Sequence, residues 1–397
     1  MTRRFIAPLF LLLITVTLGA FAQLATKPAS TDSQWKEVEA AMNEGRPQTA
    51  IEKLEPLIRQ ATEAKDFPAA IRAIATKIDL EGSIRPDQPD LQIRRLRSEI
   101  ETAPAEMQPV MKAVLANWMW QFFQQHRWQF AQRTQVSQSQ DEDMLTWDLV
   151  RILQAIDDQF TAALAGKELL QSTPTESYAV LLEDSNASTS FRPTMYDVLA
   201  HHALEFYSAG EQVTTLASNA FELTADSPIF ASREDFLAWN PQAPDERSPL
   251  LRAVRLYQDL LRFHQDDEDP AARLDADLLR LEFGNNHAIG DEKTSRYQAA
   301  LRRFESAHAS HPISTRALHN LALTVHEQGD WAEAHRIASQ GLARFPDSVG
   351  ANRCYNLIQQ IEAKEASATT ERVWNDPWPT IDVRYRNVDK VFLRLIK

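Results

Sequence analysis

The chain has little cysteine and little glycine. Cys354 is its only cysteine, which excludes an intrachain disulfide framework and a multi-cysteine metal site. Ten glycines in 397 residues are too few for a β-rich or phosphate-loop protein, whereas Ala, Leu, Gln and Glu are plentiful. These absences indicate a helical protein, and 44% apolar residues suffice for a core. We expect Cys354 to be a small buried apolar residue; an intermolecular disulfide or a reactive thiol is the alternative.

The motifs of common catalytic and nucleotide-binding sites are also absent. The sequence contains no G-x-x-x-x-G-K-[ST], G-x-G-x-x-G, G-x-S-x-G, H-E-x-x-H or paired C-x-x-C. His201, His202 and Glu205 could offer metal ligands from one helix, but without a further ligand a partly exposed helix turn is the simpler interpretation. We therefore expect no enzyme, metal or cofactor, although a triad assembled in space leaves no sequence motif.

Long apolar runs are missing except near the N-terminus. Residues 1–22 contain two early arginines, an apolar run over 9–18, and a small-x-small sequence that ends at Ala22, before Gln23. The run has about half of the roughly twenty residues that a membrane-spanning helix needs, so the pattern predicts a signal peptide cleaved at Ala22; a retained anchor is the alternative. We expect an exported protein, periplasmic or extracellular, that does not span the membrane after cleavage.

Negative charge exceeds positive charge. Lys and Arg number 42 against 55 Asp and Glu, giving a formal charge of −13, and loss of the two arginines of the leader takes it to −15. A chain this acidic repels phosphate backbones, so we expect no nucleic acid partner. Carboxylate pairs are common in so acidic a chain and identify no function. The four acids over 266–269 are interpreted as a solvated turn with an N-cap before Pro270.

A 34-residue period lies in the C-terminal third. The period joins two sets of four residues: Ala300, Phe304, Ala307 and Pro312 recur as Ala334, Ala338, Gly341 and Pro346. Small residues let the two helices of a hairpin approach closely, and proline stops the second helix. With Leu321, Gly329 and Trp331, the pattern resembles the tetratricopeptide repeat (TPR), a two-helix unit. We expect one complete unit over 315–348, after the second helix of another over 295–311.

Helical spacing continues upstream with a looser period. Helices are expected over 35–43, 47–61, 67–80, 107–123, 143–170, 193–207, 250–264 and 270–283, and 227–239 is expected to be a loop that packs back on the helices. The helix over 107–123 has apolar residues on two faces, so we expect it to be buried on both; an aromatic ligand platform is the alternative. The expected fold is all-α, a TPR-like solenoid of helical hairpins over 23–365.

The last residues have a different periodicity. Residues 362–372 are polar without an apolar face, and prolines follow, so a linker is expected over 366–378. Apolar and polar residues then alternate over 381–386 and again over 391–395, which predicts two short strands within 379–397. A lone hairpin is marginally stable in water, so these strands are expected to begin an incomplete β-domain.

The closing VRYRNVDKVFLRLIK closely resembles the opening strands of the first macroglobulin domain in large bacterial proteins of the alpha-2-macroglobulin family. The resemblance marks Tyr385, Asn387, Val388 and Asp389 as the start of that β-domain, and 192–197 and 227–230 look like stretches that recur in the helical regions of the family. It implies an exported peptidase trap, but the thioester motif C-x-E-Q is absent.

The resemblance sets two functional expectations. The first is a non-catalytic N-terminal scaffold or docking module of a macroglobulin-like peptidase inhibitor, in a longer chain that continues with the bait and thioester regions. Its partner is then the rest of that chain or another envelope protein. The alternative is a stand-alone periplasmic TPR-type adaptor for a peptide or protein. Strand addition to another chain is a further possibility for the closing strands.

Overall fold

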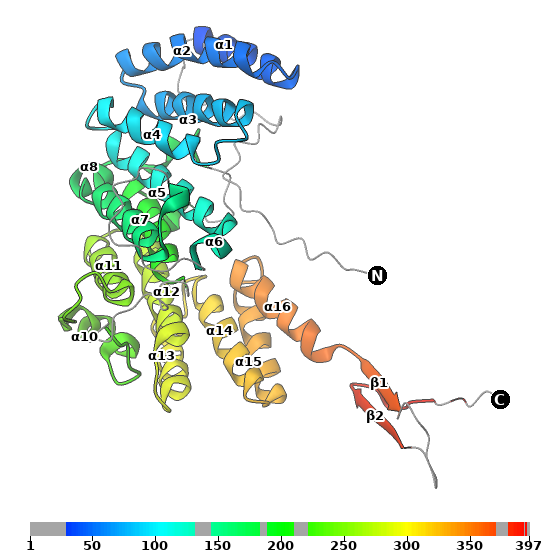
Figure 1. Ribbon diagram of the computed structural model, residues 1–397. Helices are drawn as coiled ribbons and strands as arrows, with labels where there is room; N and C mark the ends of the chain where they lie inside the picture. The colour runs from blue at the N-terminus through cyan, green and yellow to red at the C-terminus, as the bar shows by residue number, and fades with distance from the viewer. Residues whose placement is uncertain are drawn as a thin grey trace. The chain divides into compact units, whose positions relative to one another are not determined.

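The computed structural model describes residues 29–131, 144–182, 189–209, 221–370, 380–392 and 394; the predicted leader, with Ala22 and Gln23, lies outside them. The described chain is mostly helical with one antiparallel strand pair, which confirms the expected fold class (Figure 1). Its contacts define two compact units within the region expected to form one helical array. The first lies within Met1–Phe221 and Gln242–Leu260, and the second within Glu222–Pro241 and Leu261–Lys397.

The first unit consists of helices joined mostly by short turns. Its helices are α1 (Ala29–Asn43), α2 (Pro47–Glu63), α3 (Phe67–Ile84), α4 (Leu91–Thr102), α5 (Gln108–Gln125), α6 (Arg127–Ala131), α7 (Leu149–Leu164), α8 (Lys167–Ser172), α9 (Met195–Tyr207) and most of α11 (Pro249–Phe263), with 3₁₀ turns η1 (Met144–Thr146), η2 (Thr175–Tyr178) and η3 (Thr189–Phe191). The first three helices share a buried apolar cluster that includes Trp35, Val38 and Leu54. Gly45 joins α1 to α2 with φ +68°, a left-handed conformation that glycine adopts without strain.

Helix α5 is buried on two faces, as its two apolar faces predict. Met111 and Met119 are fully buried on one face, and Phe123 is 1% exposed on the other. Trp120 stacks on Phe123 at 5.4 Å and meets the edge of Phe206 from α9 at 5.2 Å. These aromatic side chains pack within the protein, so the structure favours the core interpretation over a ligand platform.

The single helix expected over 143–170 is instead two helices. α7 ends at Leu164 and α8 begins at Lys167, with Gly166 between them. A Cβ atom at Gly166 would lie 2.8 Å from the Pro109 ring, so glycine allows the close approach of this turn to α5. Periodicity alone does not reveal such a contact, because Pro109 is remote in sequence.

The second unit contains the predicted repeat. Its elements are η5 (Pro228–Phe230), α10 (Arg233–Ala238), α12 (Ala271–His287), α13 (Lys293–Ala307), α14 (Ser314–Glu327), α15 (Trp331–Arg344), α16 (Val349–Glu362), β1 (Glu365–Thr370) and β2 (Ile381–Arg386), and α11 ends in it. Helices α14 and α15 form the complete hairpin expected over 315–348, and α16 packs on both of them (Figure 1). The Asp330 side chain accepts from the Glu333 amide and so caps the start of α15.

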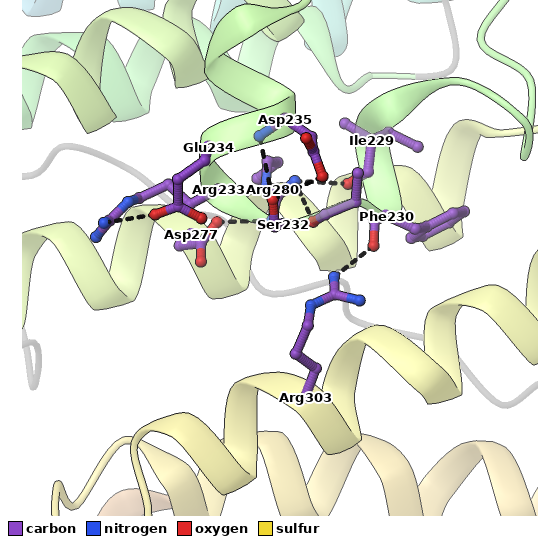
Figure 2. A network of polar contacts seen from close by, with 10 residues as sticks. Ile229, Phe230, Ser232, Arg233, Glu234, Asp235, Asp277, Arg280 and Arg303 are labelled. Atoms are coloured by element: carbon purple, nitrogen blue, oxygen red, sulfur yellow. Dashed lines mark hydrogen bonds and ion pairs between the residues drawn. The ribbon is translucent and has the colours of Figure 1, made fainter.

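The segment over 228–239 packs back on the helices, as expected, but it is not a loop throughout, because Pro228–Phe230 forms η5 and Arg233–Ala238 forms α10. Ile229 and Phe236 are fully buried, and the completely buried Arg280 of α12 donates to the carbonyl oxygens of Ile229 and Ala231 at 3.0 and 3.3 Å. Figure 2 shows this network, in which Arg303 of α13 donates to the Phe230 carbonyl at 2.6 Å. Two arginines therefore satisfy carbonyl groups that the short η5 turn leaves without helical partners.

The prediction of a linker over 366–378 is wrong for its first residues, because Glu365–Thr370 forms strand β1. This strand pairs antiparallel with β2, and Ala366 lies opposite Tyr385. The polar sequence of β1 lacks strand alternation because the whole strand is exposed, so neither face needs apolar residues. The second strand expected over 391–395 is also not seen: Val391 and Phe392 lie outside any strand, and Leu393 and Leu395 lie outside the described residues.

The strand pair is attached to the repeat helices. Asn387, with φ +55°, donates from Nδ2 to the carbonyl oxygens of Ile361 and Ala363 at 2.6 and 3.1 Å. The Arg386 guanidinium lies 4.8 Å from the Trp331 ring centre. Of the other residues marked as a β-domain start, Tyr385 is 66% exposed, Val388 is half-buried and Asp389 is exposed. These contacts place the strand pair in the second unit.

Candidate functional site: the exposed face of the repeat helices

The residues singled out by the 34-residue period divide into two groups. Six are buried between helices: Ala300, Phe304, Leu321, Ala334, Ala338 and Gly341. Five are exposed: Ala307, Pro312, Gly329, Trp331 and Pro346. Ala307 differs from the expected packing role because it lines a solvent-open cavity, and Trp331 differs because it stacks on His326 at 5.5 Å on the surface. Gly329 has φ +90°, which explains glycine in that turn.

Helix α14 presents one stripe of side chains that its packing covers only in part, with Leu323 exposed and the other three half-buried. Arg316, His319, Asn320 and Leu323 recur at the i, i+3, i+4, i+7 spacing of a single helix face. The remaining faces carry the buried residues that pack on α13, α15 and α16. Leu323 is 37% exposed, which makes the stripe partly apolar. We call this stripe the α14 face.

Two carboxylates of α12 hold the α14 face in place. Arg316 pairs with the nearly buried Asp275 and lies 3.6 Å from Glu282. Asn320 donates from Nδ2 to Glu282 Oε1 at 2.7 Å. Because both helices are fixed by contacts near these residues, the polar side chains have few alternative positions. Such a preorganised surface loses little conformational entropy when a partner binds.

Helix α16 adds positive charge beside the α14 face. Burial lowers the pKa of His319, and the guanidinium groups of Arg353 and Arg316 lower it further, against the hydrogen bond that His319 makes to Asn320 at 3.1 Å. His319 is therefore neutral at pH 7. Arg353 is exposed and has no carboxylate partner in the part of the chain that the structure describes. The surface thus carries one uncompensated cation next to an exposed leucine.

The other histidines singled out by the sequence have ordinary structural contacts. His201 bonds the Asp197 carbonyl at 2.8 Å, and His202 bonds Asn117 of α5 at 3.3 Å. Within the described ranges, no group of three His, Cys, Asp or Glu side chains could hold a metal ion. Asp157 of α7 pairs with Arg252 at 2.7 Å and accepts from the Tyr207 hydroxyl at 3.0 Å. Burial raises the pKa of Asp157, against the Arg252 charge.

Comparison with known protein families supports the repeat assignment. Residues 293–375 match the tetratricopeptide repeat family, over the helices α13 to α16 and strand β1. No curated protein matches the chain, and no match supports a macroglobulin relationship. No helix in the part of the chain that the structure describes is long and apolar enough to cross a membrane. The chain therefore contains a TPR-like region, which in general is a scaffold for protein interactions.

The sequence did not identify the members of this surface. Residues Arg316, Asn320 and Arg353 belong to no motif, and the repeat pattern includes none of them. The sequence contains only an indirect signal for this surface. Once Leu321 and its helical neighbours are assigned to the buried stripe of α14, the residues on the opposite side of the helix are expected to face outward.

Proposed function

We propose that the chain is a non-catalytic protein-binding scaffold whose docking surface is the α14 face with the adjacent side of α16. The exposed Leu323 between preorganised polar groups carries this proposal, because it gives apolar contact area next to hydrogen-bonding side chains. The TPR match over α13 to α16 supports it.

The expected ligand is an extended peptide segment of a protein partner with an acidic residue. Arg353 attracts a carboxylate, since no carboxylate of the described chain pairs with it. Asn356 is exposed one helical turn after Arg353, and its amide can donate to and accept from a peptide backbone. An apolar residue of the peptide would cover Leu323. This composition favours a peptide with mixed acidic and apolar residues over a highly charged one.

A peptide-display selection against the purified full chain tests the proposal. Binding of the selected peptides is measured by fluorescence anisotropy with the wild type and with Leu323→Asp and Arg353→Glu. Each substitution is expected to weaken binding about tenfold, because it removes about 1–2 kcal/mol of apolar or charge-assisted contact.

Matched control substitutions on α15 and α13 separate the loss of binding at the α14 face from the effect of changing surface charge in general. Ala332→Asp on α15 and Arg302→Glu on α13 introduce the same charges at exposed positions. They are expected to leave peptide affinity unchanged. If selected peptides bind equally to all four variants, or if only the controls weaken binding, the α14 face is not the docking surface.

A narrower proposal follows from the closing sequence: the scaffold is the helical N-terminal region of an exported macroglobulin-like peptidase inhibitor. The resemblance of residues 383–397 supports it, while the alternative is a stand-alone periplasmic adaptor. The nucleotide sequence beyond codon 397 discriminates the two, because the first predicts further macroglobulin domains in the same or a shifted frame. Export is tested separately, by N-terminal sequencing of the mature protein, which should begin at Gln23.

A further inference from the structure

The second unit contains a solvent-open cavity of about 240 Å³ between the 231–234 turn, α12 and α13. Most of the residues that line it are apolar or basic. The apolar ones are Ala231, Leu274, Leu281, Ala300, Phe304 and Ala307, and the basic ones are Arg233, Arg273, Arg280, Arg303 and His308. None of these residues belongs to the α14 face. In a chain with a formal charge of −13, four arginines around one cavity are a local reversal of charge.

The positive charge of the cavity is only partly neutralised. Glu234 and Asp277 are its two acidic lining residues, and they pair with Arg233 at 2.8 Å and Arg280 at 2.7 Å (Figure 2). Arg303 instead donates to a backbone carbonyl of the η5 turn, and neither it nor Arg273 has a carboxylate partner in the described ranges. Two guanidinium charges therefore remain uncompensated.

The remaining basic residue adds no charge at neutral pH. Burial lowers the pKa of His308, and the positive charges of Arg273 and Arg233 lower it further, against the Asp277 carboxylate. The neutral imidazole lies edge-on to the Phe304 ring at 4.8 Å. His308 thus contributes a polar but uncharged surface beside the apolar lining.

Two N–H groups at the cavity are buried without acceptors. Arg280 is fixed by bonds from its two terminal nitrogens to the Ile229 and Ala231 carbonyls, yet its Nε has no hydrogen-bond partner. The Nε of Arg273 is likewise buried and unpaired, although one of its terminal nitrogens donates to the Gln265 carbonyl at 3.0 Å. Buried donors without acceptors are costly, but both Nε atoms are closed to solvent, so a ligand in the open cavity would be held by the uncompensated charges of Arg273 and Arg303.

We propose that this cavity binds a carboxylate carried on a short apolar stem. Guanidinium groups hold carboxylates by charge-assisted, often bidentate hydrogen bonds, and the leucine, alanine and phenylalanine side chains accommodate the stem. The volume is below the roughly 300–1,000 Å³ of pockets for drug-sized ligands, so the cavity suits a single residue. The carboxylate can belong to an acidic side chain, to the C-terminal residue of a partner, or to a free small acid.

Titration of the full chain with butyrate, followed by calorimetry and ligand-observed NMR, tests the chemistry. Butyrate is expected to bind saturably and more weakly as salt increases, and the neutral isostere butyramide should bind at least about tenfold more weakly. Three peptides distinguish the sources: one with a free C-terminal leucine, its amide, and an amidated peptide with an internal glutamate. Binding of the first alone indicates a chain terminus, binding of the third indicates a side chain, and butyrate binding without peptide binding indicates a free acid.

Substitutions locate the binding. Arg303→Met and Arg273→Met should each weaken butyrate binding about tenfold, whereas Arg302→Met, exposed on α13, should not change it. Ala307→Leu should abolish binding by filling the cavity while all arginines remain, and Ala299→Leu at an exposed position of the same helix is its control. Circular dichroism and the melting temperature verify folding of each variant.

Absence of saturable butyrate binding, equal binding of butyramide, or full affinity in folded Ala307→Leu would overturn the proposal. Leu323→Asp should leave butyrate binding intact, so the cavity and the docking surface succeed or fail independently.

Discussion

Replacement of Gly341 by alanine tests the helix packing of the repeat, because two effects of known sign oppose each other there. Gly341 lies inside α15, where alanine would ordinarily stabilise a helix by about 1 kcal/mol. A Cβ atom at this position would lie 2.6 Å from Cys354 Sγ and 3.2 Å from Leu318 Cβ. Cys354 is fully buried and cannot move into solvent. Overpacking of this kind costs about 1–3 kcal/mol, so Gly341→Ala should destabilise the second unit by about 1 kcal/mol net.

A double-mutant cycle with Cys354→Ala isolates the contact, measured as the free energy of unfolding in urea. Cys354→Ala removes the sulfur atom that the new methyl group would meet. In that background Gly341→Ala should be neutral or stabilising, which gives a coupling energy of at least about 1 kcal/mol. Additive effects of the two substitutions would refute the reasoning, because they would mean that the contact with Cys354 of α16 is not what makes alanine unfavourable at position 341.

Three further predictions concern the packing and charge of the chain. Gly350→Ala should cost about 3 kcal/mol in urea unfolding, because its Cβ would meet the backbone of Thr315 as well as its hydroxyl, and Thr315→Ala should restore only part of this. Arg252→Met should lower the free energy of unfolding by about 3 kcal/mol, because it leaves the Asp157 carboxylate buried without its partner. This is the lower end of the range for a broken buried ion pair, since the Arg252 side chain is 22% exposed. Adding Asp157→Asn should reduce the loss, because it removes the unpaired charge. Burial lowers the pKa of His202, so the unfolded chain binds more protons and stability should fall as pH drops below 6.5; His202→Gln should flatten this dependence of the melting temperature on pH.

The repeat helices could be predicted because their packing rule is local in sequence. A small residue is needed where two helices of a hairpin approach closely, so Ala334 repeats the position of Ala300, and the period is visible without a structure. Strand β1 could not be predicted in this way. Its six residues are exposed on both faces and carry no alternation, and its conformation is decided by pairing with β2 beyond a stretch of intervening chain.

The arginine-lined cavity could not be predicted from the sequence, for a different reason. Arg273 and Arg280 lie on α12 and Arg303 lies on α13, and no fixed spacing relates the two helices in a sequence motif. Their convergence depends on the 228–239 segment, whose carbonyl groups hold Arg280 and Arg303 in place. The sequence did predict that this segment packs on the helices. It could not predict which side chains would meet there, because a packed loop has no periodicity from which to infer its contacts.

The strand pair raises the question of whether residues 365–387 belong to the repeat stack or to a separate domain. The last carbonyl groups of a helix have no partners within the helix, and at the end of α16 the Asn387 amide satisfies two carbonyls of this region. Arg386 covers the Trp331 ring, which is itself stacked on His326 of α14. Residues 381–387 thus cap the C-terminal end of α16, where Asn387 adopts a left-handed conformation.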